Sequence, residues 1–134
     1  MYLADMAHTK YVKNNHPLHN NTHSFCRGHV SAVSHGEWHP TEKNILITSA
    51  QDSTVRIWDA TNPNQQKTVL KFKDAKGKPK LAVTTCAYSR DGNIIAASGE
   101  DGSLWLWSAT GPYNRPQQVF YLSKNILCYF ILFT

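Results

Sequence analysis

The chain has 134 residues, of which 41% are hydrophobic and 17% are charged, and this balance is typical of a folded domain rather than a disordered segment. Its net charge of +5 permits an acidic or nucleic-acid partner but does not require one. The three cysteines are odd in number and lack a short metal-type spacing, and the N-terminus shows no secretory signal, so we expect a reducing compartment rather than a secreted disulfide scaffold.

Residues 11–27, YVKNNHPLHNNTHSFCR, are rich in Asn and His and predict an insertion that is a loop or disordered. Within it, His16, His19, His23 and Cys26 form a cluster that resembles a set of metal ligands. Their spacing lacks the paired ligands of a structural zinc motif, so we predict no metal site and no cofactor.

An internal repeat dominates the rest of the chain. The stretch from Ile45 to Trp58 aligns without gaps with the stretch from Ile94 to Trp107. Identical residues stand at Ile45/Ile94, Ser49/Ser98, Asp52/Asp101 and Trp58/Trp107. A self-similar unit of this length indicates an array of small supersecondary units.

Each unit has the period of β structure. A short strand ends at an aromatic residue, Trp38 or Tyr88, and is followed by a polar turn, an apolar strand and a tight turn. The last strand, 55–58 or 104–107, alternates, so alternate side chains face opposite sides of the sheet. Because helical periodicity is missing throughout, we predict an all-β chain.

The marks at the two ends of the first unit are Gly28-His29 and Trp58-Asp59. With Asp52 in the tight turn between them, they resemble the WD-repeat β-propeller family. We expect a buried polar network of His29, Asp52, Trp58 and a strand hydroxyl. The candidate hydroxyl is Ser49, although in the family it often lies two residues before the Asp, where this chain has Ala50. The second unit is degenerate, with Asp101 and Trp107 as its counterparts and Trp107-Ser108 in place of Trp-Asp.

Two units make two blades, and a propeller needs roughly four to eight. We therefore predict a partial WD-repeat propeller, either a fragment or part of an assembly completed by other blades or by self-association. The expected parts are the last strand of a preceding blade (1–10), the insertion (11–27), the first unit (28–66), a lysine-rich connection (67–80), the second unit (81–109) and a divergent apolar tail (110–134).

A closer resemblance lies in YLADMAHTK, GHVSAVSHGEWHP and the run from SAQDSTVRIWDA to DGNIIAA. These look like the gastrulation-defective-type WD-repeat proteins, which are nuclear and have been tied to the genome-damage response and to cullin-type ubiquitin ligases. The resemblance implies a non-catalytic, protein-binding scaffold in the nucleus, with the cytoplasm as the alternative. The Arg that docks some WD-repeat proteins to a ligase adaptor is missing two residues after each dipeptide, where Thr61 and Thr110 stand.

Other residues suggest surfaces. Arg56 and Trp105 occupy equivalent strand positions and are candidates for a partner surface. The connection carries a candidate basic patch, Lys71, Lys73, Lys76, Lys78 and Lys80, which supports the alternative of a nucleic-acid or chromatin binder. The apolar segment 119–134 is short for a membrane span, so we expect a terminal strand or an artefact of the sequence rather than an anchor. A third alternative is a truncated, non-functional product.

Overall fold

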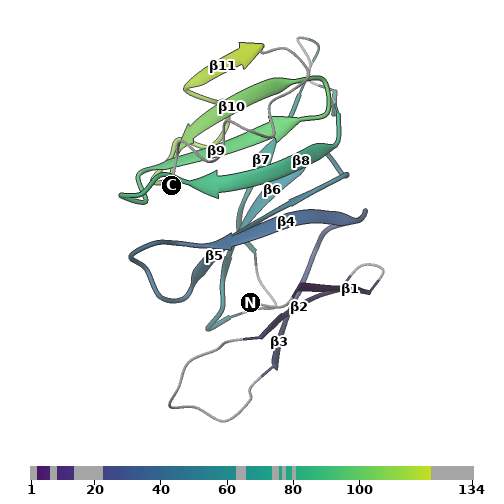
Figure 1. Cartoon of the computed structure of the whole chain (residues 1–134), viewed down its shortest axis with the longest axis vertical. Coiled ribbons are helices and arrows are strands. Elements are labelled where there is room, and N and C mark those ends of the chain that lie inside the picture. The colour runs from purple at the N-terminus through teal and green to yellow at the C-terminus, as the bar shows by residue number, and fades with distance from the viewer. Residues whose placement is uncertain are drawn as a thin grey trace.

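The computed structural model describes residues 3–6, 9–13, 23–62, 66–73, 76, 78–79 and 81–121, and before Cys26 it describes only the course of the backbone. Strands make up all the regular structure in these residues, arranged in three antiparallel sheets (Figure 1). The predicted all-β class is confirmed.

The first sheet has three strands in the order β1 (Leu3–Met6), β2 (Thr9–Lys13) and β3 (His23–Arg27). The second sheet, called blade one below, has four strands in chain order: β4 (Val33–Trp38), β5 (Ile45–Ala50), β6 (Thr54–Asp59) and β7 (Gln66–Lys71). Blade two repeats that plan with β8 (Val83–Tyr88), β9 (Ile94–Gly99), β10 (Ser103–Ser108) and β11 (Gln118–Tyr121). The described strands do not close a propeller.

Residues at equivalent positions of the two sequence repeats pair in the same register in the two blades. Ile47 faces Ile57 across β5 and β6, and Ala96 faces Leu106 across β9 and β10. The inner strand of each blade carries a register irregularity at its start, between Val33 and His35 and again between Val83 and Thr85. Equivalent sequences therefore build equivalent sheets, down to the position of the bulge.

The main hydrophobic core lies between the two blades. All six residues of β5 are buried, because β5 has neighbours on both faces of its sheet. One face of blade one packs against blade two, and its buried residues form a single cluster with those of blade two. Its members include Ile47, Val55, Ile57, Leu70, Val83, Cys86, Tyr88, Ile95, Trp105 and Trp107. A sheet buried on both faces is the arrangement that stacked blades require.

A second, smaller core covers the opposite face of blade one. Cys26 at the end of β3 lies with Leu46 and Trp58, and Trp38 packs against them. The first sheet therefore contributes to burying blade one, as a neighbouring blade would.

Polar contacts also join the inner strands β4 and β8. Ser34 donates a hydrogen bond to the Val83 carbonyl at 2.6 Å, and Glu37 accepts one from the Tyr88 amide at 3.2 Å. His39, after β4, lies edge-on to the Tyr88 ring, and its Nε2 donates to the Gly92 carbonyl at 3.1 Å. These four contacts are spaced along the strand pair and the turns that follow it, and they hold the blades in one relative position.

The structure differs from the expected loops at two places. Residues 11–13 and 23–27 of the expected insertion lie in strands β2 and β3, and residues 14–22 lie outside the described part. The lysine-rich connection begins as strand β7. Within the expected tail, 110–134, strand β11 covers residues 118–121. Residues 122–134, which make up most of the apolar segment 119–134, are also outside the residues that the structure describes.

Candidate functional site

Asp52 organises the tight turn between β5 and β6. Its Oδ1 accepts hydrogen bonds from the Thr54 amide at 3.1 Å and from the Thr54 hydroxyl at 2.5 Å. Ser53 between them has a φ of 63°, a left-handed conformation that the bonds on both sides hold in place. The turn therefore fixes one edge of the Asp52 carboxylate and leaves the other edge free to reach across the blade.

The other carboxylate oxygen, Oδ2, ends a chain of hydrogen bonds that runs from Trp58 through Thr48 and His29. The Trp58 indole N–H donates to the Thr48 hydroxyl at 2.8 Å, and this hydroxyl lies 2.7 Å from His29 Nε2. His29 Nδ1 lies 2.9 Å from Asp52 Oδ2. The directions are mutually consistent when Thr48 donates to Nε2 and the protonated Nδ1 donates to the carboxylate. His29, Thr48 and Trp58 are all buried, so each polar group is satisfied away from water.

Thr48, four residues before Asp52, supplies the hydroxyl, and Ser49 does not join the network. Successive strand residues face opposite sides, so Thr48 shares a face with Trp58 while Ser49 points to the other blade. There its hydroxyl lies 2.8 Å from that of Ser34, which itself donates to Val83. Ser49 therefore contributes to the junction between the blades.

Arg56 belongs to the same network rather than to an open partner surface. Its Nη2 lies 3.6 Å from Asp52 Oδ2, its Nε donates to the Thr54 hydroxyl at 3.4 Å, and its Nη1 donates to Gln66. The half-buried guanidinium of Arg56 partly balances the negative charge of the Asp52 carboxylate. Burial lowers the pKa of Arg56 and the Asp52 charge opposes this change.

The environment of Asp52 stabilises its charged form. Burial would raise its pKa, but hydrogen bonds from His29, from Thr54 and from the Val30 amide together hold the pKa at about 2. The Val30 amide donates to Oδ2 at 3.1 Å. Asp52 thus stays ionised over the physiological range and ties the loop before β4 to the turn after β5.

Blade two uses a different version of this site. Asp101 Oδ1 accepts from the Ser103 amide at 3.0 Å and from its hydroxyl at 2.5 Å, as Asp52 does from Thr54. The Trp105 indole N–H then donates to the Ser103 hydroxyl at 2.8 Å. Pro79 and Ala97 stand where the repeat places His29 and Thr48, so the histidine relay has no counterpart here.

The assignment of Trp105 to a partner surface is wrong. Only 5% of Trp105 is exposed, and it stacks between Phe72 at 4.6 Å and Trp107 at 5.8 Å, measured between ring centroids. Phe72 follows β7, so the connection between the blades covers this face of β10. Trp107 is fully buried in the same cluster.

Both blades present equivalent loops along one edge. The Gln51 amide donates to the Ala32 carbonyl at 2.9 Å, and the Glu100 amide donates to the Ala82 carbonyl at 3.0 Å. In each blade, these bonds join the loop before the first strand to the turn before the third. We call the exposed residues Val30, Ser31, Gln51 and Glu100 the loop rim. Val30 is 68% exposed, an apolar side chain held outward beside the buried network.

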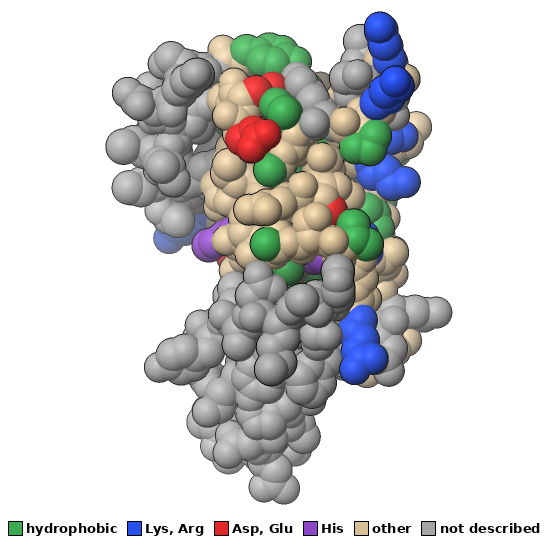
Figure 2. Space-filling model, turned by 90° about the vertical axis from the view of Figure 1, so that its right-hand side faces the viewer, with side chains coloured by type: hydrophobic (Ala, Val, Ile, Leu, Met, Phe, Trp, Pro, Cys, Tyr) green, Lys and Arg blue, Asp and Glu red, His purple; other side chains and the backbone are tan. Residues whose placement is uncertain are grey.

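The lysines of the connection are exposed wherever they are described. They are Lys67 and Lys71 on β7 and Lys73, Lys76 and Lys78 beyond it. Lys80, the last member of the predicted patch, lies outside the described residues. Figure 2 shows Lys and Arg side chains gathered along one edge of the visible face. Phe72, the aromatic residue among these lysines, is buried and is not available to stack on a base.

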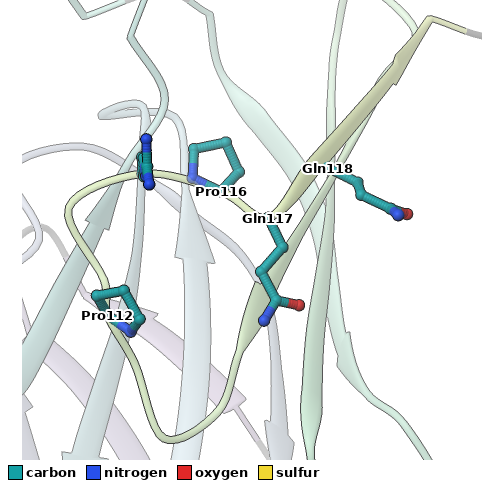
Figure 3. Close-up of a pocket in the computed structure, with 5 residues that line it drawn as sticks. Pro112, Pro116, Gln117 and Gln118 are labelled. Carbon is teal, nitrogen blue, oxygen red and sulfur yellow. The ribbon is translucent and has the colours of Figure 1, made fainter.

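A pocket of about 550 Å³ is lined by one connection, between β10 and β11. Figure 3 shows Pro112 and Pro116 on this loop, with Gln117 and Gln118 where it enters β11. Arg115 is the ionisable residue of its lining. A single cation does not provide the paired groups that acid–base catalysis needs.

Within the described residues, no group of three or more His, Cys, Asp and Glu side chains is placed to hold a metal ion, and His16 and His19 lie outside these residues. In the same part of the chain, no helix has the length and apolar character needed to cross a membrane.

Two stacked four-stranded sheets, with a Gly-His to Trp-Asp network in the first, define a repeat protein of the propeller class. The family described as "WD domain, G-beta repeat" matches residues 20–59 and 67–108. The chain therefore belongs to the WD40 repeat family, as its sequence resemblance indicated.

The chain is similar to WD repeat-containing protein 70. The human protein is 41% identical over 92 residues, and the rat protein is 40% identical over 92 residues. Each match covers 69% of this chain and 11% of the relative. The Drosophila melanogaster gastrulation defective protein 1 homolog is 32% identical over 90 residues, covering 67% of this chain and 11% of that protein. The predicted resemblance to gastrulation-defective-type proteins is confirmed. The matched segment is thus a small part of each relative, and proteins of this family are typically non-enzymatic scaffolds.

Proposed function

We propose that the chain acts as a scaffold that holds a protein partner against the loop rim, in the nucleus. The observation that carries this proposal is the outward-facing Val30, whose own amide is bonded to Asp52. A fixed apolar side chain surrounded by polar loop residues is a common feature of protein contact sites. The link to the genome-damage response, which the family resemblance implies, is part of the same proposal.

The buried network supports this role because it limits loop motion. Asp52 binds the loop through Val30 and the turn through Thr54, so the two rim segments move as one body. A binding surface that is ordered before contact loses less entropy when the partner arrives. The network is therefore proposed to prepare the rim for binding, with no chemical step of its own.

Site-directed photo-crosslinking in cells tests the proposal. A benzoylphenylalanine at position 30 should yield discrete protein adducts, and the same probe at Lys43 should not. Lys43 is a matched control because it is exposed, but it lies between β4 and β5 at the other end of these strands. Identical adduct patterns at the two positions, or no adducts at position 30, would refute the rim as the contact surface.

The nuclear location is tested separately by imaging a fluorescently tagged chain. Accumulation in the nucleus supports the proposal, and exclusion from the nucleus contradicts it whatever the crosslinking shows.

A further inference from the structure

A second surface lies on the outer strand of blade one, apart from the loop rim. Among the described strands β7 is paired with β6 alone, so β7 forms the edge of its sheet. The edge of a sheet presents backbone N–H and C=O groups that can pair with another chain. Three exposed lysines mark this strand and its continuation, Lys67, Lys71 and Lys73, and we call them the lysine edge. Beyond the strand, Lys73 forms an isolated antiparallel bridge with Pro79, so the open backbone edge is that of β7 itself.

The side chains of the lysine edge follow the period of the strand. Leu70 and Phe72 point into the core, so Lys71 and Lys73 point the opposite way, on the same side as Val69. Residues two apart on a strand are about 6.6 Å apart, which is also the spacing of alternate side chains in a strand laid alongside. Lys67 lies where the register with β6 shifts, and it extends the row to the start of β7.

The charge of this edge is only partly balanced by neighbouring carboxylates. Asp52 is committed to His29 and Arg56, and its side chain is 3% exposed. Hydrogen bonds donated by Thr61 lower the pKa of Asp59, and the positive charge of the nearby Lys67 lowers it further by a smaller amount. Among the described residues, neither Lys71 nor Lys73 forms an ion pair with a carboxylate.

We propose that the lysine edge binds an extended acidic peptide segment that adds to β7 as a further antiparallel strand. Backbone hydrogen bonds supply the pairing, and carboxylates at alternate positions meet Lys71 and Lys73. Lysines on an edge strand repel basic strands and lose hydration without compensation beside uncharged ones, so they also select against other occupants. An extended polyanion without peptide amides satisfies the charges but cannot pair with the strand.

Fluorescence anisotropy with the full chain tests this proposal. The probe is a labelled peptide that alternates Glu and Val, and we expect saturable binding that weakens as salt increases. The charge-reversed variant Lys71→Glu/Lys73→Glu should bind at least about tenfold more weakly, because like charges would then face each other. Lys43→Glu, an exposed control away from β7, should bind as the unmodified chain does. If charge reversal perturbs the fold, Lys71→Gln/Lys73→Gln replaces it.

Two further probes separate strand addition from simple charge attraction. A peptide of the same composition with alternate backbone amides N-methylated should lose binding, because it cannot complete the ladder. A single-stranded oligonucleotide of thymidines should bind more weakly than the peptide. Equal binding of the methylated peptide, preferential binding of the oligonucleotide, or no binding of the unmodified Glu/Val peptide would each overturn the proposal. Crosslinking at position 30 is independent of all three outcomes.

Discussion

Asp52 accepts hydrogen bonds at both carboxylate oxygens, and one of its donors is His29, which has no histidine counterpart in blade two. Thr54 donates to Oδ1, while His29 and the Val30 amide donate to Oδ2. An Asn at position 52 would present an N–H₂ group to one of these two sets of donors. The bonds that Ser103 donates to Asp101 end on Oδ1, and an Asn oxygen can replace it in them.

We therefore expect Asp52→Asn to lower the free energy of unfolding by about 1–3 kcal/mol, as for a buried polar group left unsatisfied. Asp101→Asn should cost less. Urea midpoints of the two variants, measured in a complete propeller carrying both blades, make the comparison. Equal losses would show that the His29 relay does not stabilise blade one.

The lowered pKa of Asp52 predicts sensitivity to acid. The group titrates at about 2 when folded against 3.8 as the reference value, so its stabilising contribution is complete above about pH 4. That contribution is lost as the pH falls from 4 towards 2. Urea midpoints between pH 5 and pH 2 should decline less steeply for Asp52→Asn than for the unmodified protein. Parallel declines would mean that other carboxylates account for the acid sensitivity.

The two tryptophans Trp58 and Trp105 are equally committed to the interior. Trp58 is 1% exposed with its N–H on Thr48, and Trp105 is 5% exposed with its N–H on Ser103. Truncating either one to Ala should cost about 3–5 kcal/mol. The same urea midpoints test this, with Leu104→Ala, a partly exposed neighbour on β10, as the milder control. A Trp105→Ala loss as small as that of the control would contradict the observed stacking on Phe72.

Among the elements, the turn between β8 and β9 depends on a glycine. Gly92 has a φ of 76°, where an L side chain is strained, and a Cβ there would collide with the His39 ring. Gly92→Ala should therefore lower the free energy of unfolding by more than about 2 kcal/mol.

A double-mutant cycle separates the two causes of that loss. Adding His39→Ala should recover the part due to the collision, leaving the backbone strain. If the combined loss equals the sum of the single losses, His39 does not contact this turn as observed.

The strand pattern could be predicted from the sequence because each element carries its own period and turn residues. The alternation of side chains along β5 could also have identified the network hydroxyl as that of Thr48. Its spacing from Asp52 differs from the family's usual spacing and pointed to Ser49 instead. Thr48 lies two residues from Leu46 and Ala50, on the face that Trp58 shares, whereas Ser49 lies on the other face. The burial of Trp105 could not be predicted in this way, because Phe72 covers it from a connection whose path depends on packing between the blades.

At the scale of the whole molecule, blade two leaves large apolar side chains exposed on its outer strand. Phe120 and Tyr121 on β11 are 42% and 69% exposed, and β11 is paired with β10 alone among the described strands. We expect the chain to self-associate at micromolar concentration, as exposed apolar edge strands do. Light scattering after size exclusion should show species larger than a monomer, reduced in Phe120→Lys/Tyr121→Lys. A monodisperse monomer with strongly protected amides throughout would contradict this expectation.

Phe72 shows that the boundary between the two blades in the packed structure differs from the boundary between the two repeats in the sequence. The residue follows the last strand of blade one, but its ring stacks on Trp105 of blade two. Opening of β10 in hydrogen exchange must therefore release the end of β7 as well. The smallest cooperative unit then spans the junction of two repeats, so that each blade transmits its local unfolding to its neighbour.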